Sequence, residues 1–301
     1  MSLKVHVKEE ERPPARALTD SVASCEVSLY RNVLKIKQDH DLVDLGISFF
    51  DVETTLQWAY NADRYFHAAS TMKLAVLLGV FRQIERGELT LDAPVHVRNR
   101  FISIVNQEPF MLDLGSDADP DVYGHLGKTL TVRELAYWMI TKSSNLATNL
   151  LVDVIGIRTI QHALDEQEID GVRVLRGVED QAAFAANLNN EVTANGLAKL
   201  LRLIADGKAY SQQASDEMRN ILLDQQYQSG IPAGLPKTAR IAHKTGNIST
   251  VHHDAGIVYL DGRKPYVLVI LTQFRAEARI GTAVADVSRD IFNTLAGMTY
   301  E

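Results

Sequence analysis

An apolar segment that covers nearly the whole circumference of a predicted helix constrains this chain most. Residues 71–84 read TMKLAVLLGVFRQI, with apolar side chains at almost every position up to Phe81. A helix that is hydrophobic on nearly all faces is stable only at the centre of a domain. Ser70 stands immediately before this segment, so its hydroxyl would be held on a rigid, buried platform.

Lys73 follows Ser70 by one helical turn. A serine hydroxyl becomes a good nucleophile only when a base removes its proton, and a lysine can do so when burial and neighbours lower its pKa. Because residues three apart share one face of a helix, we expect Lys73 Nζ to reach Ser70 Oγ. The unpaired N–H groups and positive dipole of the helix start would favour negative charge on Ser70.

Two more short motifs lie at helix and strand boundaries, Ser143-Ser144-Asn145 and Lys244-Thr245-Gly246. Thr131 and Glu134 form a capping box that predicts a helix through residue 140, and residues 144–154 predict the next one. Ser143 is therefore expected in the turn between two helices.

Alternating and β-branched residues predict an antiparallel sheet in two parts of the chain. Residues 47–60 favour two strands that turn near Glu53. Three more strands are expected at 240–245, 251–260 and 265–273, with turns at Gly246-Asn247 and Asp261-Gly262. The motif Lys244-Thr245-Gly246 would then end the first of these three.

The three motifs together, in this order, resemble the penicillin-recognising active-site serine enzymes, and within them the class A β-lactamases. The similarity runs from Leu42 to the C-terminus and includes Arg133-Glu134-Leu135, Asn149-Leu150-Leu151 and Ala233-Gly234-Leu235-Pro236. The resemblance implies an α/β (α+β) fold of the β-lactamase/transpeptidase type, with an antiparallel sheet flanked by helices and an all-helical lobe.

The resemblance also implies roles for acylation. Ser70 would attack the lactam carbonyl, and Lys73 would accept or relay its proton, with its pKa held down partly by the cation of Lys244. Ser143 would pass a proton to the departing ring nitrogen, and Asn145 would hold the substrate side-chain amide.

The rest of the implied substrate site lies on the third motif and the residue after it. Lys244 and Thr245 would bind the substrate carboxylate. The backbone N–H groups of Ser70 and Asn247 would form the oxyanion hole, with Gly246 giving the acyl group room to approach.

Hydrolysis needs a residue that activates water for attack on the acyl-enzyme, and Glu179 lies at the family spacing from Ser143 without a gap. A solvated loop carboxylate is the alternative interpretation. The chain departs from the family pattern at Ala183, where an asparagine orients that water, and at Ser144, where aspartate is usual. Asn187, Asn189 or Asn190 could replace the missing asparagine from a shifted loop.

A long connection over 97–127 would border the substrate cleft in this family. Phe110 is the first candidate to line the mouth of the site and Tyr123 the second, with packing of a long loop as the alternative. No metal site is expected, because the adjacent His252 and His253 would point to opposite faces of a strand. No cofactor is expected either.

The motifs come from both ends and the middle of 301 residues. We therefore expect one catalytic unit over 18–301, with an N-terminal extension at 1–17. Its α/β lobe would comprise 18–91 and 235–301, and its helical lobe 92–234. A net charge of −7 without a basic stripe argues against nucleic acid and membrane surfaces as partners. The resemblance implies a small β-lactam or peptidoglycan-like substrate, and we expect a monomer.

Three functions stay open from the sequence: a β-lactamase, a D,D-peptidase or esterase of the same fold, and a penicillin-binding sensor that remains acylated. The charged, proline-bearing N-terminus lacks the apolar core of a secretory signal. The protein is therefore expected to be either cytoplasmic or exported with its leader removed.

Overall fold

The computed structural model describes residues 15–115, 117–275 and 281–296, and side chains from Glu26 to Thr294 outside the two gaps. The expected extension 1–17 lies almost wholly outside these residues. None of the described helices is long and apolar enough to cross a membrane.

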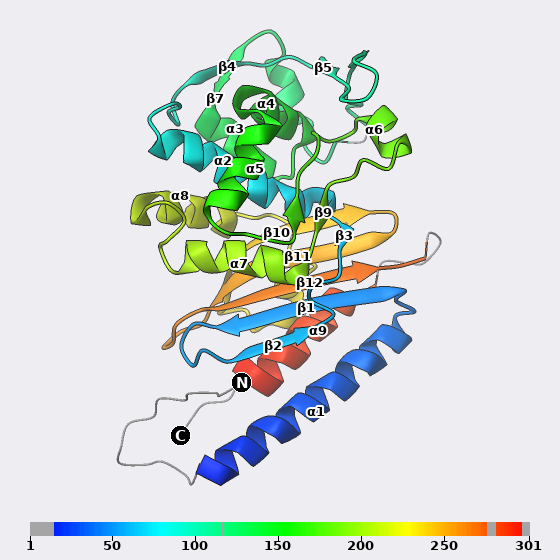
Figure 1. The fold of residues 1–301 in the computed structure, drawn as a ribbon, viewed down its shortest axis with the longest axis vertical. Coiled ribbons are helices and arrows are strands. Elements are labelled where there is room, and N and C mark those ends of the chain that lie inside the picture. The colour runs from blue at the N-terminus through cyan, green and yellow to red at the C-terminus, as the bar shows by residue number, and fades with distance from the viewer. Residues whose placement is uncertain (1–14, 116, 276–280, 297–301) are drawn as a thin grey trace.

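A five-stranded antiparallel sheet forms the middle layer of the molecule (Figure 1). Its strand order is β10-β11-β12-β1-β2. The strands are β1 (Asp44–Asp51), β2 (Gln57–Tyr60), β10 (Arg240–Ile248), β11 (Val251–Tyr259) and β12 (Tyr266–Gln273). The sequence predicted all five strands and the turns near Glu53 and at Asp261-Gly262, and this is confirmed.

The turn predicted at Gly246-Asn247 is wrong. Strand β10 continues to Ile248, because its ladder with β11 runs on through the pairs Gly246–His253 and Ile248–Val251. Gly246 is needed for close approach: a Cβ at this position would lie 3.0 Å from Thr71 Cγ2. The glycine that suggested a turn therefore marks the point where an edge strand meets the segment of Ser70.

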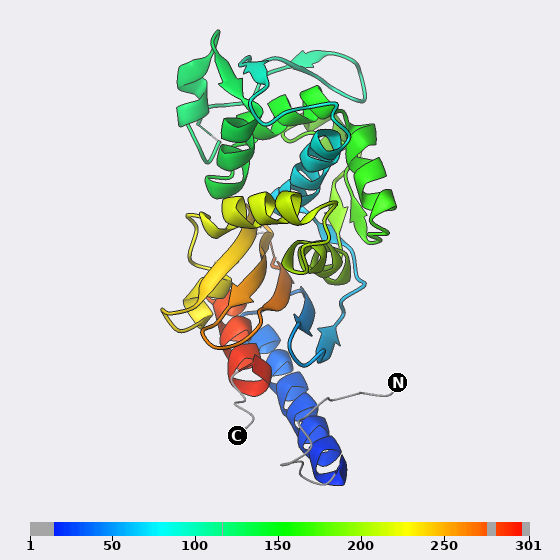
Figure 2. The ribbon, with the colours of Figure 1, turned by 90° about the vertical axis from the view of Figure 1, so that its left-hand side faces the viewer.

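Helices cover both faces of the sheet. Helices α1 (Ala15–Asp39) and α9 (Ala283–Ile291), with the short turns η3 (Ile231–Gly234) and η4 (Phe292–Ala296), cover one face (Figure 2). Helices α7 (Ala194–Ala205) and α8 (Gln212–Leu223) cover the other. Side chains alternate between two apolar cores along each strand: Leu268 and Ile270 pack towards α1 and α9, and Val267 and Val269 towards α7.

The remaining helices form the upper part of the molecule in Figure 1. They are α2 (Lys73–Glu85), α3 (Val132–Thr141), α4 (Asn145–Ile155), α5 (Ile157–Glu166) and α6 (Gln181–Ala185). Helix α2 is buried from Lys73 to Phe81 and packs against α4 and α5, as its apolar sequence predicted. The capping box at Thr131 is present.

Short strands and turns connect these helices. They are β3 (Phe66–His67) with β8 (Val172–Arg173) and β9 (Glu191–Val192), β4 (Pro94–His96) with β7 (Thr129–Thr131), β5 (Phe101–Ile102) with β6 (Pro109–Phe110), and the 3-10 turns η1 (Ala69–Met72) and η2 (Asp121–His125). The division into lobes at the expected boundaries stays a prediction. Helix α2 packs among the upper helices, and α7 and α8 pack on the sheet, so these elements lie across the expected boundaries.

Candidate active site

Ser70 lies in the 3-10 turn η1, directly before α2. The backbone of this turn is fixed on both sides of the serine. Ala69 has a positive φ of 44° and donates its N–H to His67 Nδ1 at 3.1 Å, and Thr71 Oγ1 donates to the carbonyl of Ala68 at 2.6 Å. The half-buried Ser70 side chain makes no hydrogen bond among the described residues, so its Oγ is presented without a competing partner.

Lys73 is completely buried and its ammonium is held by the turn before α4. Lys73 Nζ donates to the carbonyl of Ser143 at 2.7 Å, to Asn145 Oδ1 at 2.8 Å, to Ser143 Oγ at 3.3 Å and to the carbonyl of Ser144 at 3.4 Å. The expected direct contact with Ser70 Oγ is absent among these hydrogen bonds. The ammonium turns instead towards four oxygen atoms, because a buried charge needs such partners.

Burial lowers the pKa of Lys73 from its ordinary 10.5 to about 7. The negative charges of Asp117 and Glu179 oppose this shift. Lys244 was expected to hold this pKa down, but burial is the cause. Repulsion between the two ammonium groups affects Lys244 instead. Burial lowers the pKa of Lys244, and the charge of Lys73 lowers it further. At neutral pH the neutral amine of Lys73 is therefore accessible as a base.

Ser143 lies between the two lysines. Lys244 Nζ donates to Ser143 Oγ at 3.0 Å and to the carbonyl of Thr245 at 2.9 Å. The contacts Lys73–Ser143–Lys244 thus form one hydrogen-bonded chain in the interior, along which a proton can move. Ser143 itself has a φ of 59°, a conformation that a serine keeps only when its surroundings enforce it.

Glu179 faces this chain from the loop before α6. Asn145 Nδ2 donates to Glu179 Oε1 at 2.7 Å, while Asn145 Oδ1 accepts from Lys73. Asn149, on α4, holds this loop in place. Its side chain accepts a hydrogen bond from the N–H of Val178 at 2.7 Å and donates one to the carbonyl of Val178 at 2.9 Å. A Cβ at Gly177 would lie only 2.4 Å from Asn149 Oδ1, so this arrangement requires a glycine there.

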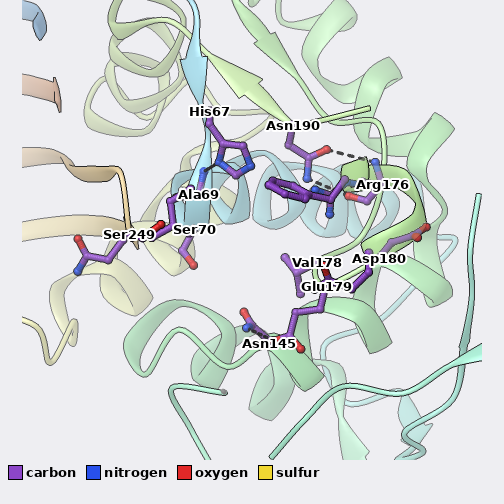
Figure 3. A pocket seen from close by; sticks show the side chains of 14 residues that line it. His67, Ala69, Ser70, Asn145, Arg176, Val178, Glu179, Asp180, Asn190 and Ser249 are labelled. Atoms are coloured by element: carbon purple, nitrogen blue, oxygen red, sulfur yellow. Dashed lines mark hydrogen bonds between the residues drawn. The ribbon is translucent and has the colours of Figure 1, made fainter. Parts of the chain in front are cut away.

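A pocket of about 310 Å³ opens beside Ser70 (Figure 3). Asn145 and Glu179 lie on the opposite side of it from His67 and Asn190. Its lining residues are His67, Ala69, Ser70, Asn145, Arg176, Val178, Glu179, Asp180, Gln181, Phe184, Asn190, Asn247, Ile248 and Ser249. Of the predicted site residues, Lys73, Ser143, Lys244, Thr245 and Gly246 lie buried behind this wall rather than in it.

Asn247 reaches the pocket because β10 is an edge strand that lies against η1. A Cβ at Gly246 would lie 3.1 Å from the backbone nitrogen of Thr71 and 3.2 Å from that of Ser70. The strand backbone and the start of η1 therefore meet at the pocket. An oxyanion hole built from the N–H groups of Ser70 and Asn247 needs these two segments to lie close together, and it stays a prediction.

Phe110 is not among the lining residues of this pocket, and its expected place at the mouth of the cleft stays a prediction. It packs against Phe101 at 5.9 Å between ring centroids, because the β5–β6 hairpin folds both rings onto the core. It lines a separate hollow behind the loop that carries Gly177 and Asp180. Tyr123 is likewise packed against the core and not in the pocket wall.

Sequence reasoning missed His67, Arg176 and Phe184 as pocket residues. The Phe184 and His67 rings meet edge-on at 6.4 Å, and burial, with the nearby charge of Arg176 second, lowers the pKa of His67. No motif marks His67 or Phe184. Arg176 stands only three residues before Glu179, and this spacing was the one available signal.

The three candidate asparagines do not present an unbonded side chain to the pocket among the described residues. Asn190 lines the pocket, but its Oδ1 accepts from the N–H groups of Leu175 and Arg176 at 2.8 and 3.2 Å, and its Nδ2 donates to the Arg176 carbonyl at 3.0 Å. Asn189 and Asn187 contact each other at 3.2 Å, away from the pocket. Ala183 is fully buried and outside the pocket wall.

Three or more His, Cys, Asp or Glu side chains that could hold a metal do not come together anywhere among the described residues. His253 is occupied by backbone, with Nε2 at 3.0 Å from the His67 carbonyl and Nδ1 accepting from the Thr272 N–H at 3.1 Å. Burial lowers its pKa to about 4, so it is neutral.

Ser70 at the start of the helix that carries a buried lysine, with a second serine and a loop glutamate nearby on this sheet-and-helix framework, is the arrangement expected of the penicillin-recognising serine enzymes. The family model described as "Beta-lactamase enzyme family" matches residues 28–295, and the chain belongs to this family.

Curated relatives are β-lactamases at low identity. One from Bacteroides uniformis is 25% identical over 257 residues, covering 78% of this chain and 81% of the relative. β-Lactamase ROB-1 of Haemophilus influenzae is 24% identical over 307 aligned positions, covering 97% and 92%.

Among solved structures, a variant of PBP-A in an acyl-enzyme complex with penicillin G has a TM-score of 0.74 and 25% identity, covering 90% of this chain and 98% of that one. A β-lactamase from Xanthomonas campestris pv. campestris has a TM-score of 0.78 at 22% identity, covering 90% and 98%, and this likeness concerns the fold.

Proposed function

We propose that this protein is a serine hydrolase that is acylated by β-lactams and releases them by hydrolysis. The observation that carries the proposal is the position of Ser70: it lies in the wall of one pocket with Glu179 and Asn145, while the hydrogen-bonded chain Lys73–Ser143–Lys244 lies directly behind. Membership of the β-lactamase family supports the same reaction.

In the acylation step, Ser70 Oγ attacks the lactam carbonyl carbon and loses its proton to the neutral amine of Lys73. Lys73 Nζ donates to oxygen atoms of the Ser143–Asn145 turn, so this step requires the amine to turn towards Ser70 Oγ. The carbonyl oxygen takes the negative charge and is stabilised by the N–H groups of Ser70 and Asn247. The lactam C–N bond then breaks, and Ser143 donates its proton to the nitrogen. Ser143 regains a proton from Lys73, which carries the one taken from Ser70, while the hydrogen bond from Lys244 orients the Ser143 hydroxyl.

In the second step, water attacks the ester carbon of acylated Ser70. Glu179 takes the proton from that water, and the same proton then returns to Ser70 Oγ as the acid leaves. Glu179 is held for this role by its hydrogen bond from Asn145 and by its φ of 61°. Lys244 and Thr245 attract the carboxylate of the substrate, although both lie behind the pocket wall.

A second candidate is a penicillin-binding peptidase or sensor of the same fold, with slow release of the acyl group. The observation that favours it is the lack of an amide to orient the water, since Ala183 is buried and the Asn190 side chain is bonded to the loop backbone. The structural neighbour PBP-A, caught as an acyl-enzyme with penicillin G, points the same way.

Steady-state hydrolysis of penicillin G tests the proposal, with Ser70→Ala as the control. The proposal expects hydrolysis by the wild-type protein that exceeds the control. A wild-type protein that binds penicillin G covalently without turnover would favour the second candidate, and one that does neither would refute both.

A further inference from the structure

Asp117 reaches the turn that carries Ser143 from a different part of the chain. Its Oδ1 accepts from the N–H of Asn145 at 2.9 Å, and its Oδ2 accepts from the N–H of Leu146 at 2.9 Å. These are the first two N–H groups of α4, which have no acceptor within the helix. A carboxylate is well suited to this place, because the positive end of the helix dipole also attracts it.

The same loop holds the residue before Ser143. Lys142 Nζ forms an ion pair with Asp121, and a second with the buried Asp119 at 3.7 Å. The turn is therefore fixed at Lys142 on one side and at Asn145 on the other. Ser143 lies between these two anchors.

This fixation matters because the turn is strained and carries the groups that hold Lys73. Ser143 has a φ of 59°, a strained conformation that persists only when its surroundings enforce it. The carbonyl groups of Ser143 and Ser144 and the Asn145 side chain all accept from Lys73. A relaxed turn would withdraw these acceptors from the ammonium.

Ser144 cannot supply the charge at this point. Its Oγ accepts one hydrogen bond, from the N–H of Ala147 at 3.2 Å, and caps α4 as a neutral group. The carboxylate at the start of α4 comes instead from Asp117, 28 residues earlier in the chain.

We propose that Asp117 is a positioning residue of this active site, which holds the Ser143–Asn145 turn in its strained form and places a negative charge near the buried Lys73. The inference rests on the proposed function for its kinetic test. The ionisable groups that act on Lys73 support it: Asp117 is the larger of the two charges that raise the Lys73 pKa against burial, Glu179 is the other, and Lys244 is the cation on the far side of Ser143.

The test compares Asp117→Asn with Glu108→Gln, which removes one charge from the same long connection at an exposed position that contacts Asn106 and not the turn. The acylation rate with penicillin G is measured against pH. The acidic limb of this profile is the pH range over which the acylation rate falls as Lys73 becomes protonated. In Asp117→Asn we expect this limb to lie at lower pH by roughly half to one unit, because the variant removes a negative charge that stabilises protonated Lys73. The plateau should fall by up to roughly 10²-fold, since the turn is less well positioned.

Glu108→Gln should keep the wild-type limb and plateau. A purely structural role of Asp117 would reduce the plateau without moving the limb. An Asp117→Asn protein whose limb stays at the wild-type pH therefore overturns the proposal, whatever its plateau.

Two further variants keep the test independent of folding. Adding Ser144→Asp to Asp117→Asn should return the acidic limb towards the wild-type pH, because a carboxylate again caps α4. If the double variant has the same acidic limb as Asp117→Asn alone, the two positions do not share this role. Should Asp117→Asn not fold, Asp117→Glu keeps the charge but changes the reach, and is expected to keep the limb and lower the plateau. A moved limb in Asp117→Glu would contradict the proposal.

A measurement without substrate separates failure of this inference from failure of the proposed function. If penicillin G does not acylate the wild-type protein, the pKa of Lys73 can still be followed by NMR on protein labelled at lysine. A lower Lys73 pKa in Asp117→Asn than in Glu108→Gln supports the positioning role without any substrate, and equal values refute it.

Discussion

The side-chain amide of Asn145 joins the two halves of the proposed reaction: its Nδ2 donates to Glu179 at 2.7 Å and its Oδ1 accepts from Lys73 at 2.8 Å. The base for acylation and the base for deacylation therefore share one neighbour. The charge of Glu179 raises the pKa of Lys73, so a change in the charge of Glu179 changes the pKa of Lys73.

Replacing Ser70 by alanine should abolish both covalent labelling and hydrolysis while the fold is retained. The Ser70 hydroxyl makes no hydrogen bond among the described residues, so its loss should change the free energy of unfolding by less than about 0.5 kcal/mol. Thermal melting and mass spectrometry with penicillin G check both parts. Turnover by this variant would refute the role of Ser70.

Lys73→Ala should slow acylation by roughly two to four decades, since general-base catalysis is lost.

The pH dependence of acylation by the wild-type protein provides the matching measurement. Because the pKa of Lys73 is lowered to about 7, the neutral base predominates above pH 7, and acylation should fall progressively below it. An acylation rate that is flat from pH 5 to 8 would mean that another group takes the proton.

Glu179→Gln should leave acylation measurable and let the adduct accumulate. The amide can hold a water molecule but cannot take its proton. Decay of the adduct, followed by stopped-flow or mass spectrometry, should be slowed by roughly two decades or more. Unchanged decay would show that Glu179 is not the base for deacylation.

Gly246→Ala should impair acylation without unfolding the protein. The new Cβ would lie 3.0 Å from Thr71 Cγ2 and 3.2 Å from the nitrogen of Ser70, so β10 and η1 must move apart where the two N–H groups meet the substrate. A shift of this kind can cost up to roughly 10²-fold in rate. Gly124→Ala, in η2, provides the control, because a Cβ there meets no atom within 4 Å. Wild-type acylation by Gly246→Ala would exclude the close approach.

Short-range patterns predicted much of the fold. The buried helix after Ser70 follows from its apolar composition, and the Thr131 capping box follows from local hydrogen bonding. The end of β10 could not be predicted in this way. A glycine in a strand signals either a turn or a close approach, and only the position of η1 decides between them.

Long-range contacts account for the errors at the site. Lys73 was expected at Ser70 because local helix geometry brings them together, but the side chain is drawn to the Ser143 turn, 70 residues away in the chain. The contact of the Phe110 ring with Phe101 could not be predicted either, because it depends on the pairing of β5 with β6. Asp117 carries no local signal, since its partners lie in another element.

The central claim is that Ser70 forms an acyl-enzyme that water then releases. Intact-mass spectrometry over time after mixing with penicillin G tests it most directly. The account predicts an adduct of the mass of penicillin G on the wild-type protein, absent in Ser70→Ala, which decays as hydrolysed penicillin appears. An adduct that also forms on Ser70→Ala, or no adduct and no hydrolysis by the wild-type protein, would contradict it.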